Sequence, residues 1–411
     1  MCFQMELRRP YNTCMKIVIC PQAFKGGLRG TEAAEAMAAG VRRVHPDASL
    51  VLLPVADGGD GTLDALIGGG VPPALAHGGA GMMAGGASAS ARVSYSLVQG
   101  PLGERLWALW GDMPDNRTAV VELARASGLA LVAPERRNPL RASTYGTGQL
   151  IRAALNAGYP RIIVGLGGSA TNDGGSGIAQ ALGARFLDAD GNELPLGGAA
   201  LARLAHVDLS GLDPRVQGAL ILAATDVSNP LCGPEGAAAT YGPQKGATPD
   251  MVAELDAALE NFGQVILRDL GMDVMGLPRM GAAGGAGAGL YALLGAEVGS
   301  GADIVIDALG LDAALTGADL VITGEGCTDW QTMYDKAPIV VARRAKKKGV
   351  SVIAVSGSLG KGWEAVLEHG VTLAEAAAPA DMPLAEAMAR ARELLADAAE
   401  RAVSRWTKQK D

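Results

Sequence analysis

The sequence predicts an α/β fold with mainly parallel strands, and three observations point to it. Short apolar runs alternate with longer Ala-rich segments of helical periodicity, the order expected when a helix connects each strand to the next. The chain contains 58 glycines and only 4% aromatic residues, a composition that suits strands joined by tight loops to Ala-rich helices. Its 411 residues exceed what one hydrophobic core usually serves, so we expect two domains.

The N-terminal part of the chain has the pattern of a β–α–β unit. Lys16–Cys20 is a short apolar run and predicts a buried strand. Thr31 predicts the start of an Ala-rich helix, because its side chain can accept a hydrogen bond from a free amide of the first turn. Leu50–Val55 predicts the second strand. The sharp loop Asp57–Gly61 follows, and Thr62 then begins another helix.

The same alternation continues to the C-terminus. Apolar runs predict strands at Ala119–Leu123, Arg161–Leu166, Leu220–Ala224, Leu320–Thr323 and Val350–Val355. Helical patterns cover Tyr145–Ala157, Pro249–Leu270, Ala337–Lys348, Trp363–His369 and Leu384–Trp406. Residues 68–92 are rich in Gly, Ala and Pro and support no assignment.

The composition also excludes several classes of protein. A net charge of −8 argues against a general nucleic-acid surface. No apolar run reaches the roughly 18–20 residues of a membrane span. The five cysteines are scattered and lack the spacing of a metal site, so we expect reduced thiols and a cytoplasmic location. Residues 1–14 lack the apolar core of a signal peptide, and we expect a disordered extension there.

Small and acidic residues follow strand after strand. In open α/β sheets, ligands bind at the carboxyl ends of the strands. We therefore expect four loops to converge on a site: Asp57–Thr62, Gly167–Gly175, Thr225–Asn229 and Thr323–Thr332.

The glycine-rich loop after the strand at 161–166 carries the most informative pattern. Glycines let a phosphate approach the backbone, where amide N–H groups and the next helix N-terminus can bind it. Ser169, Thr171 and Asn172 add neutral donors, and Asp173 adds a carboxylate. A tight structural turn is the alternative interpretation.

Acidic and basic side chains accompany the other loops. Asp57 and Asp60 could bind Mg²⁺, orient a hydroxyl or accept a proton, and an Asx turn with a helix cap is the alternative. Asp226 places an acid directly after a strand. Lys245 and Lys25 lie beside glycines and could reach a phosphate, although each could also be a solvent-facing loop lysine.

Several familiar kinds of site are missing from the sequence. There is no GxxxxGK[ST] phosphate loop and no protein-kinase signature, and no GxGxxG follows the first strand. The four histidines stand outside the glycine-rich loops, which argues against a Ser-His-Asp triad or a histidine zinc site.

Taken in order along the chain, these loops resemble those of the type I glycerate kinases (glycerate 2-kinases), a bacterial family that phosphorylates D-glycerate with ATP. Seven stretches match in family order between about Met15 and Lys361. They are PQAFKGGL (21–28), PVADGGDGT (54–62), ASTYGTGQLIRAAL (142–155), VGLGGSATNDGGSG (164–177), DVSNPLCGPEGAAATYGPQKGAT (226–248), GAAGG (281–285), and TGEGCTDWQT with KAP (323–332, 336–338).

The resemblance implies two domains with a site in the cleft between them. A Rossmann-like parallel-sheet domain, residues 15–70 and 296–411, is expected to be interrupted by an inserted second α/β domain, residues 71–295. The implied activity is transfer of the ATP γ-phosphoryl group to D-glycerate with Mg²⁺, giving 2-phosphoglycerate. The partners are then two small molecules, with no nucleic acid and no membrane, and a homodimer is compatible with this interpretation.

Phosphoryl transfer needs alignment, charge neutralisation and a group that receives the hydroxyl proton. Our hypothesis gives the proton to Asp173 or Asp60 and uses Lys25 to offset phosphate charge. Asp226 and Glu325 are expected to hold Mg²⁺, directly or through water. The expected substrate- and phosphate-binding residues are Asp57, Gly58, Gly59, Gly167, Gly168, Ser169, Thr171, Asn172, Asn229, Lys245, Gln331 and Thr332.

Some loop residues depart from the family pattern. Gln22-Ala23 stand where Asp-Ser is usual, Cys327 stands where Arg is usual, and Asp335 replaces a Gly. Trp330 and Arg279-Met280 occupy places that are usually small. These departures keep open a degenerate, non-catalytic kinase relative that binds a small organic acid or nucleotide.

Two other enzyme classes share single features with this chain. Gly165–Ala170 (GLGGSA) is similar to a loop of the galactokinase-like GHMP kinases, but the DGGDG and TGEG loops have no place in that fold. A Rossmann oxidoreductase would need the dinucleotide fingerprint that the sequence lacks.

Overall fold

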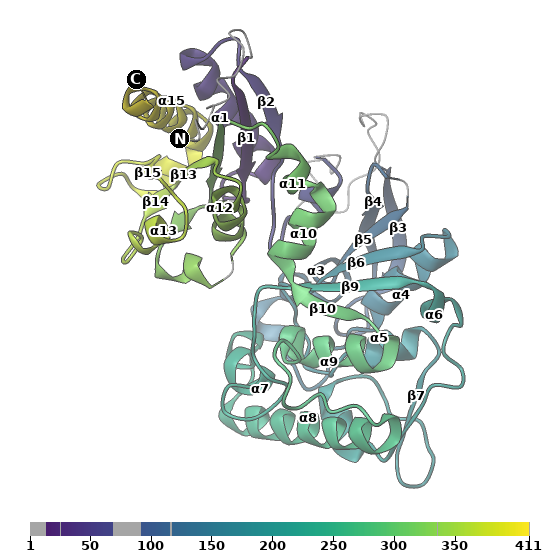
Figure 1. The fold of residues 1–411 in the computed structure, drawn as a ribbon. Helices are drawn as coiled ribbons and strands as arrows, with labels where there is room; N and C mark the ends of the chain where they lie inside the picture. Colours follow the sequence, from purple (N-terminus) through teal and green to yellow (C-terminus); the bar gives the residue numbers. More distant parts are fainter. Residues whose placement is uncertain (1–13, 25, 69–91, 116, 335, 411) are drawn as a thin grey trace, which may run out of the picture. The chain divides into compact units, whose positions relative to one another are not determined.

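The computed structural model describes residues 14–24, 26–68, 92–115, 117–334 and 336–410. The chain divides into two compact units (Figure 1). The terminal unit combines the N-terminal part, up to Pro54, with the C-terminal part from Gly310, and the central unit is Val55–Leu309. Of the expected N-terminal extension, residues 1–13 lie outside the described residues. No helix in the described ranges is long and apolar enough to cross a membrane.

The terminal unit alternates strands and helices. In chain order its elements are β1 (Lys16–Pro21), α1 (Gly30–Val44), β2 (Ser49–Leu52), α11 (Leu311–Ala314), β11 (Leu320–Gly324), β12 (Cys327–Thr328), η6 (Trp330–Met333), α12 (Ala337–Lys347), β13 (Ser351–Ser356), β14 (Ser358–Leu359), α13 (Ala365–Glu368), β15 (Leu373–Ala376), α14 (Leu384–Ala389) and α15 (Ala391–Lys410).

Its five-stranded sheet has the order β15-β13-β11-β1-β2, and every neighbouring pair is parallel. β1 and β11 are apolar on both faces because helices cover both sides of the sheet. Ile17 and Ile19 share one core with α1 and α15, and α12 packs on β1, β11 and β13. The strand order reverses beside β1, and the carboxyl ends of β1 and β11 are the place where such sheets bind ligands.

The central unit adds an antiparallel hairpin to a parallel sheet. Its elements are α2 (Thr62–Leu66), β3 (Arg92–Gln99), β4 (Arg105–Asp112), β5 (Thr118–Glu122), α3 (Ala124–Ser127), η2 (Leu129–Leu131), η3 (Pro134–Arg136), α4 (Tyr145–Asn156), β6 (Arg161–Gly165), α5 (Ser176–Ala181), β7 (Arg185–Leu187), η4 (Gly198–Arg203), β8 (His206–Asp208), α6 (Arg215–Gly218), β9 (Leu220–Thr225), α7 (Ala237–Tyr241), η5 (Pro243–Lys245), α8 (Pro249–Leu270), α9 (Ala282–Leu294), β10 (Glu297–Ser300) and α10 (Gly301–Leu309).

The six-stranded sheet of this unit has the order β10-β9-β6-β5-β4-β3. β10, β9, β6 and β5 run parallel, and β4 and β3 run antiparallel at the end of the sheet. One face, with Val121 and Val164, packs in a large core with α4, α5, α8 and α9. The other face, with Val120 and Ile163, packs against α2 and α10. The predicted α/β class with two domains and mainly parallel strands is confirmed.

The compact units divide the chain at 54/55 and 309/310, whereas the predicted boundaries were 70/71 and 295/296. Residues 55–68 and α10 therefore belong with the central unit. The reason is burial: Leu63 and Leu66 of α2 and Val305 of α10 pack together against β5, β6 and β9.

Some elements differ from their predictions. The β3–β4 hairpin was not anticipated. The strand predicted at Leu50–Val55 ends at Leu52, and Leu53 donates one further hydrogen bond to the carbonyl of Ile19 in β1. The helix predicted over Leu384–Trp406 is two helices: α14 has no buried residue, while α15 buries one face against α1.

Candidate active site

The loop Asp57–Gly61 lies at the carboxyl ends of the parallel strands of the central sheet. The N–H of Gly167, just after β6, donates to the carbonyl of Gly58 over 3.0 Å. The N–H of Leu63 donates to Oε1 of Glu122, the last residue of β5, over 2.9 Å. The loop is therefore fastened to the loops after two neighbouring strands, as expected for a site at this edge.

Gly58 shows why this loop needs glycine. Its φ is +91°, and a Cβ atom there would lie 2.4 Å from the carbonyl oxygen of Ala224 in β9. Both the backbone conformation and the close approach exclude a side chain. The backbone of 57–60 can consequently touch β9 as well as the loop after β6.

The two acids of this loop have different surroundings. Asp57 is buried, and its Oδ1 accepts from the N–H of Gly59 over 3.3 Å, so it forms the Asx turn considered as the alternative. Asp60 is exposed, and its Oδ1 lies 3.3 Å from where a Cβ atom of Gly168 would stand. Asp60 thus places a solvated carboxylate beside the glycine-rich loop.

The glycine-rich loop after β6 is tied down on one side and leaves amides available on the other. Leu129 donates to the carbonyl of Gly168 over 2.8 Å, and Ala170 donates to the carbonyl of Ser127 over 2.9 Å. Gly168, with φ of +73°, is exposed. Within the described chain, the N–H groups of Gly168 and Ser169 donate to no protein acceptor. Two adjacent N–H groups in a glycine turn are suited to bind an anion.

Asp173 is enclosed in the protein. Its Oδ2 accepts from the N–H and from Oγ1 of Thr144, over 2.8 and 3.0 Å, and its Oδ1 accepts from the N–H of Gly175 over 3.3 Å. Burial raises the pKa of its carboxyl, and the hydrogen bonds from Thr144 and Gly175 oppose that rise. With none of its surface exposed, Asp173 holds the loop and the start of α4 in place.

Lys245 is also buried, with 2% of its surface exposed. Its Nζ donates to the carbonyl of Thr171 over 2.7 Å. Burial lowers its pKa to about 7, although the nearby Asp173 carboxyl acts in the opposite direction. The solvent-facing alternative for Lys245 is therefore wrong: the side chain fastens η5 to the glycine-rich loop.

Two amide side chains differ in their contacts. Asn172 is fully buried, and neither its Oδ1 nor its Nδ2 has a hydrogen-bond partner among the described residues. Asn229 is fully engaged: its Nδ2 donates to the carbonyl of Glu235 over 2.7 Å, and its Oδ1 accepts from Tyr241 over 2.7 Å. Asn229 consequently shapes the loop after β9, in which Asp226 is exposed.

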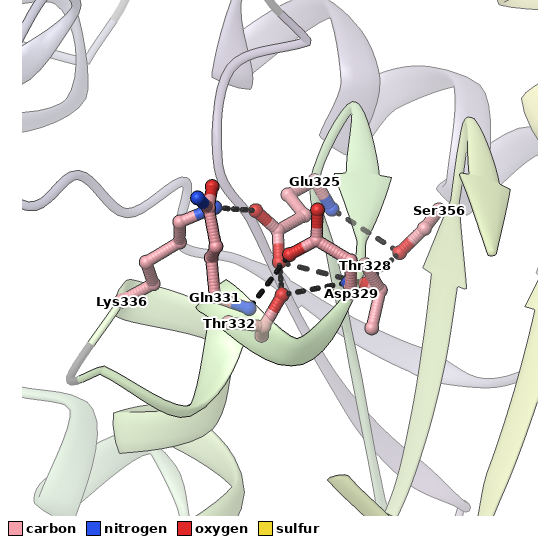
Figure 2. A network of polar contacts seen from close by, with 7 residues as sticks. All are labelled: Glu325, Thr328, Asp329, Gln331, Thr332, Lys336 and Ser356. Carbon is pink, nitrogen blue, oxygen red and sulfur yellow. Dashed lines mark hydrogen bonds and ion pairs between the residues drawn. The ribbon is translucent and has the colours of Figure 1, made fainter. Parts of the chain in front are cut away.

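The terminal unit carries a polar network at the carboxyl end of β11 (Figure 2). Glu325 is buried, and its Oε1 accepts from Oγ1 of Thr332 over 2.6 Å. Its Oε2 forms an ion pair with Nζ of Lys336 at 3.3 Å. Burial raises the pKa of the Glu325 carboxyl, and the contacts with Thr332 and Lys336 oppose this. Gln331 is exposed and donates its backbone N–H to Asp329 over 2.8 Å.

The structure brings together part of the predicted set in each unit. The central unit contains Asp57, Gly58, Gly59, Asp60, Gly167, Gly168, Ser169, Thr171, Asn172, Asp173, Asp226, Asn229 and Lys245, and the terminal unit contains Glu325, Gln331 and Thr332. Lys25 lies outside the described residues. The predicted Mg²⁺ ligands Asp226 and Glu325 belong to different units. In the described ranges, no three His, Cys, Asp or Glu side chains form a metal-binding cluster.

Glu122, which lies at the carboxyl end of β5 beside these loops, was not predicted from the sequence to be a site residue. The side chain is 3% exposed, and its Oε2 forms an ion pair with Nε of Arg125 at 2.8 Å. Its Oε1 holds the first turn of α2. A glutamate that ends the apolar run AVVE was the available signal, because a buried carboxylate requires partners.

Comparison with known proteins gives a consistent result. The model of the glycerate kinase family matches residues 17–71 and 70–407. Glycerate kinase of Halalkalibacterium halodurans is 46% identical over 394 residues, which cover 95% of this chain and 99% of that protein. Glycerate 2-kinase of Escherichia coli is 46% identical, over 87% of this chain and 89% of that protein.

A solved structure agrees with these matches. A crystal structure from Salmonella typhimurium LT2, assigned as a glycerate kinase 2, is similar with a TM-score of 0.83 and 45% identity. It covers 97% of this chain and 100% of its own. The family resemblance seen in the ordered loops is confirmed: the chain is an enzyme and belongs to the glycerate kinase family.

Proposed function

We propose that this enzyme transfers the γ-phosphoryl group of ATP to a hydroxyl group of D-glycerate and releases 2-phosphoglycerate. The observation that carries the proposal is the junction of the Asp57–Gly61 loop with the glycine-rich loop at the ends of β5, β6 and β9. It combines free amide donors with exposed carboxylates, as phosphoryl transfer requires. The name of the Escherichia coli relative, glycerate 2-kinase, supports the choice of acceptor and product.

The N–H groups of Gly168 and Ser169 are the proposed phosphate donors. Preorganised amides stabilise the charge that develops on the transferred group, because they need no reorientation during the reaction. Thr171 and Asn172 lie in the same loop, and Lys245 fixes it through the carbonyl of Thr171. In this proposal Lys245 positions the glycine-rich loop and does not touch the phosphate.

The oxygen donors of the site fit a magnesium ion. Mg²⁺ is usually held by one or two carboxylates together with substrate phosphates and water, and Asp226, directly after β9, is exposed. When bound, Mg²⁺ would neutralise phosphate charge. Glu325 suits this role less well, because its carboxylate already faces Lys336 and Thr332.

Asp60 is our preferred acceptor for the hydroxyl proton. It is solvated and lies beside Gly168, whereas Asp173 is enclosed and occupied by Thr144 and Gly175. Lys25 remains the residue proposed to offset phosphate charge, and Gln331 and Thr332 remain proposed substrate-binding residues. The proposal includes a cytoplasmic location and a homodimer, and sedimentation of the purified chain tests the latter.

The decisive experiment measures ADP formation with D-glycerate and ATP–Mg²⁺ and identifies the product by ³¹P NMR. We expect turnover and a signal of 2-phosphoglycerate. A signal of 3-phosphoglycerate would contradict the proposed regiochemistry. Binding of D-glycerate and ATP without ADP formation would support the non-catalytic alternative.

A further inference from the structure

The loop before α9 contains an arginine in a backbone conformation that favours glycine. Arg279 has φ of +73°. Its N–H donates to the carbonyl of Ser228 over 3.2 Å, and its own carbonyl accepts from Ala282 over 3.1 Å. Both polar backbone groups of Arg279 are therefore hydrogen-bonded in this left-handed conformation. A non-glycine residue there is strained, and such strain often accompanies function.

The same segment is joined to two loops of the candidate site. Gly281 donates to the carbonyl of Asn229 over 3.0 Å, which ties it to the loop after β9. The carbonyl of Gly284 accepts from Gly174 of the glycine-rich loop over 3.0 Å. Gly284 has φ of +71°, and a Cβ atom there would lie 2.0 Å from the carbonyl oxygen of Thr171. Arg279 is thus held at the edge where both loops meet.

The charges around this edge favour a cationic side chain that can bind an anionic substrate. Asp60 is an exposed carboxylate and would repel an anionic substrate. Arg125 is paired with Glu122, and the Lys245 ammonium group is buried on Thr171. The Arg279 side chain is partly exposed, and no carboxylate within the described ranges forms an ion pair with it.

We propose that the Arg279 guanidinium binds an anionic oxygen group of a substrate, either the carboxylate of the organic acid or a phosphate of the nucleotide. Guanidinium groups bind both with paired N–H donors. This inference rests on the proposed function, since it concerns the substrates of the same site. In this proposal Arg279 determines substrate specificity, and its position requires a strained backbone conformation.

The test compares Arg279→Gly and Arg279→Lys with Arg117→Ala as the control. Arg117 is exposed and precedes β5, at the opposite edge of the sheet. We expect Arg279→Gly to raise the KM of one substrate about tenfold or more, because charge-assisted hydrogen bonds are lost. The temperature of half-unfolding should rise by about 2–4 °C, because the strain is removed. Arg279→Lys should restore the KM only partly, and the control should change neither quantity.

The arms of the experiment separate the outcomes. A higher KM for D-glycerate alone identifies the carboxylate, and a higher KM for ATP alone identifies the phosphate. If both KM values stay within about twofold of the wild type, the arginine is only a strained loop residue and the inference is overturned. Calorimetric titration with D-glycerate and with ATP provides a readout without turnover. Arg279-dependent binding in a chain that makes no ADP would sink the proposed function alone, whereas no binding to the wild type would overturn both.

Discussion

Replacing Asp173 with asparagine separates a positioning role from a role as the catalytic base. The substitution keeps the shape of the side chain and removes its charge. The carboxylate accepts three hydrogen bonds from Thr144 and Gly175, over 2.8, 3.0 and 3.3 Å, with none of its surface exposed. In Asp173→Asn, one of these donors would face an NH₂ group.

The structure allows the size of the effect to be worked out. A hydrogen bond to a charged group contributes about 1.5–3 kcal/mol. The buried Lys245 would also lose the nearby negative charge that favours its charged form, and a buried donor left without its acceptor costs about 1–3 kcal/mol. We therefore expect the free energy of unfolding to fall by about 3–5 kcal/mol, as measured by urea denaturation at pH 7.

The activity of Asp173→Asn should fall for the same reason, through a displaced glycine-rich loop. A positioning role predicts that KM for ATP rises together with the loss of stability. The reasoning would be refuted by a variant that unfolds within about 0.5 kcal/mol of the wild type yet loses about a thousandfold or more in kcat. That result would assign the proton transfer to Asp173. Near-normal turnover would instead exclude it as the base.

Three further perturbations test other parts of the site. Asp60→Asn should lower kcat by about 100-fold or more with unchanged stability, and unchanged kcat in the ADP assay would remove Asp60 from the reaction. The Lys245 pKa is lowered from 10.5 to about 7 in the folded chain, so the unfolded state binds more protons above pH 7 and stability should rise with pH. Urea titrations at pH 7 and 9 should show a gain of about 1–3 kcal/mol that Lys245→Met lacks, and an equal gain in the variant would contradict this. Gly284→Ala should destabilise by about 2–4 kcal/mol, because its Cβ would meet the Thr171 carbonyl at 2.0 Å. The control Gly295→Ala, with φ of +68° and nothing within 4 Å, should cost only about 1 kcal/mol, and equal losses in thermal unfolding would rule out the clash.

Local sequence determined much of the secondary structure. The helix predicted at Pro249–Leu270 has those bounds. Thr248 accepts from the N–H of Met251 over 3.3 Å at its start, and Gly271 ends it with φ of +70°. Helix caps and the spacing of apolar residues depend on residues a few positions apart, so they can be predicted from the sequence. The helix break at Arg390 was not predicted from the sequence.

The sequence also located the loops of the site, since glycines and acids after apolar runs mark strand ends. The ordered matches identified the family because many loop residues agree together. Tertiary structure alone decided what each residue does there. The residue types of Asp60 and Asp173 are the same, yet one is solvated and the other is enclosed.

Long-range contacts explain why the role of each site residue could not be predicted from the sequence. Asp173 meets Thr144, 29 residues away, and Lys245 meets Thr171, 74 residues away. The 57–61 loop belongs to the central unit because α2 packs on β5 and β6. The backbone of Arg279 likewise bonds to Ser228, on a distant segment of the chain. Residue type sets which bonds are available, whereas burial and partners arise only when distant segments pack together.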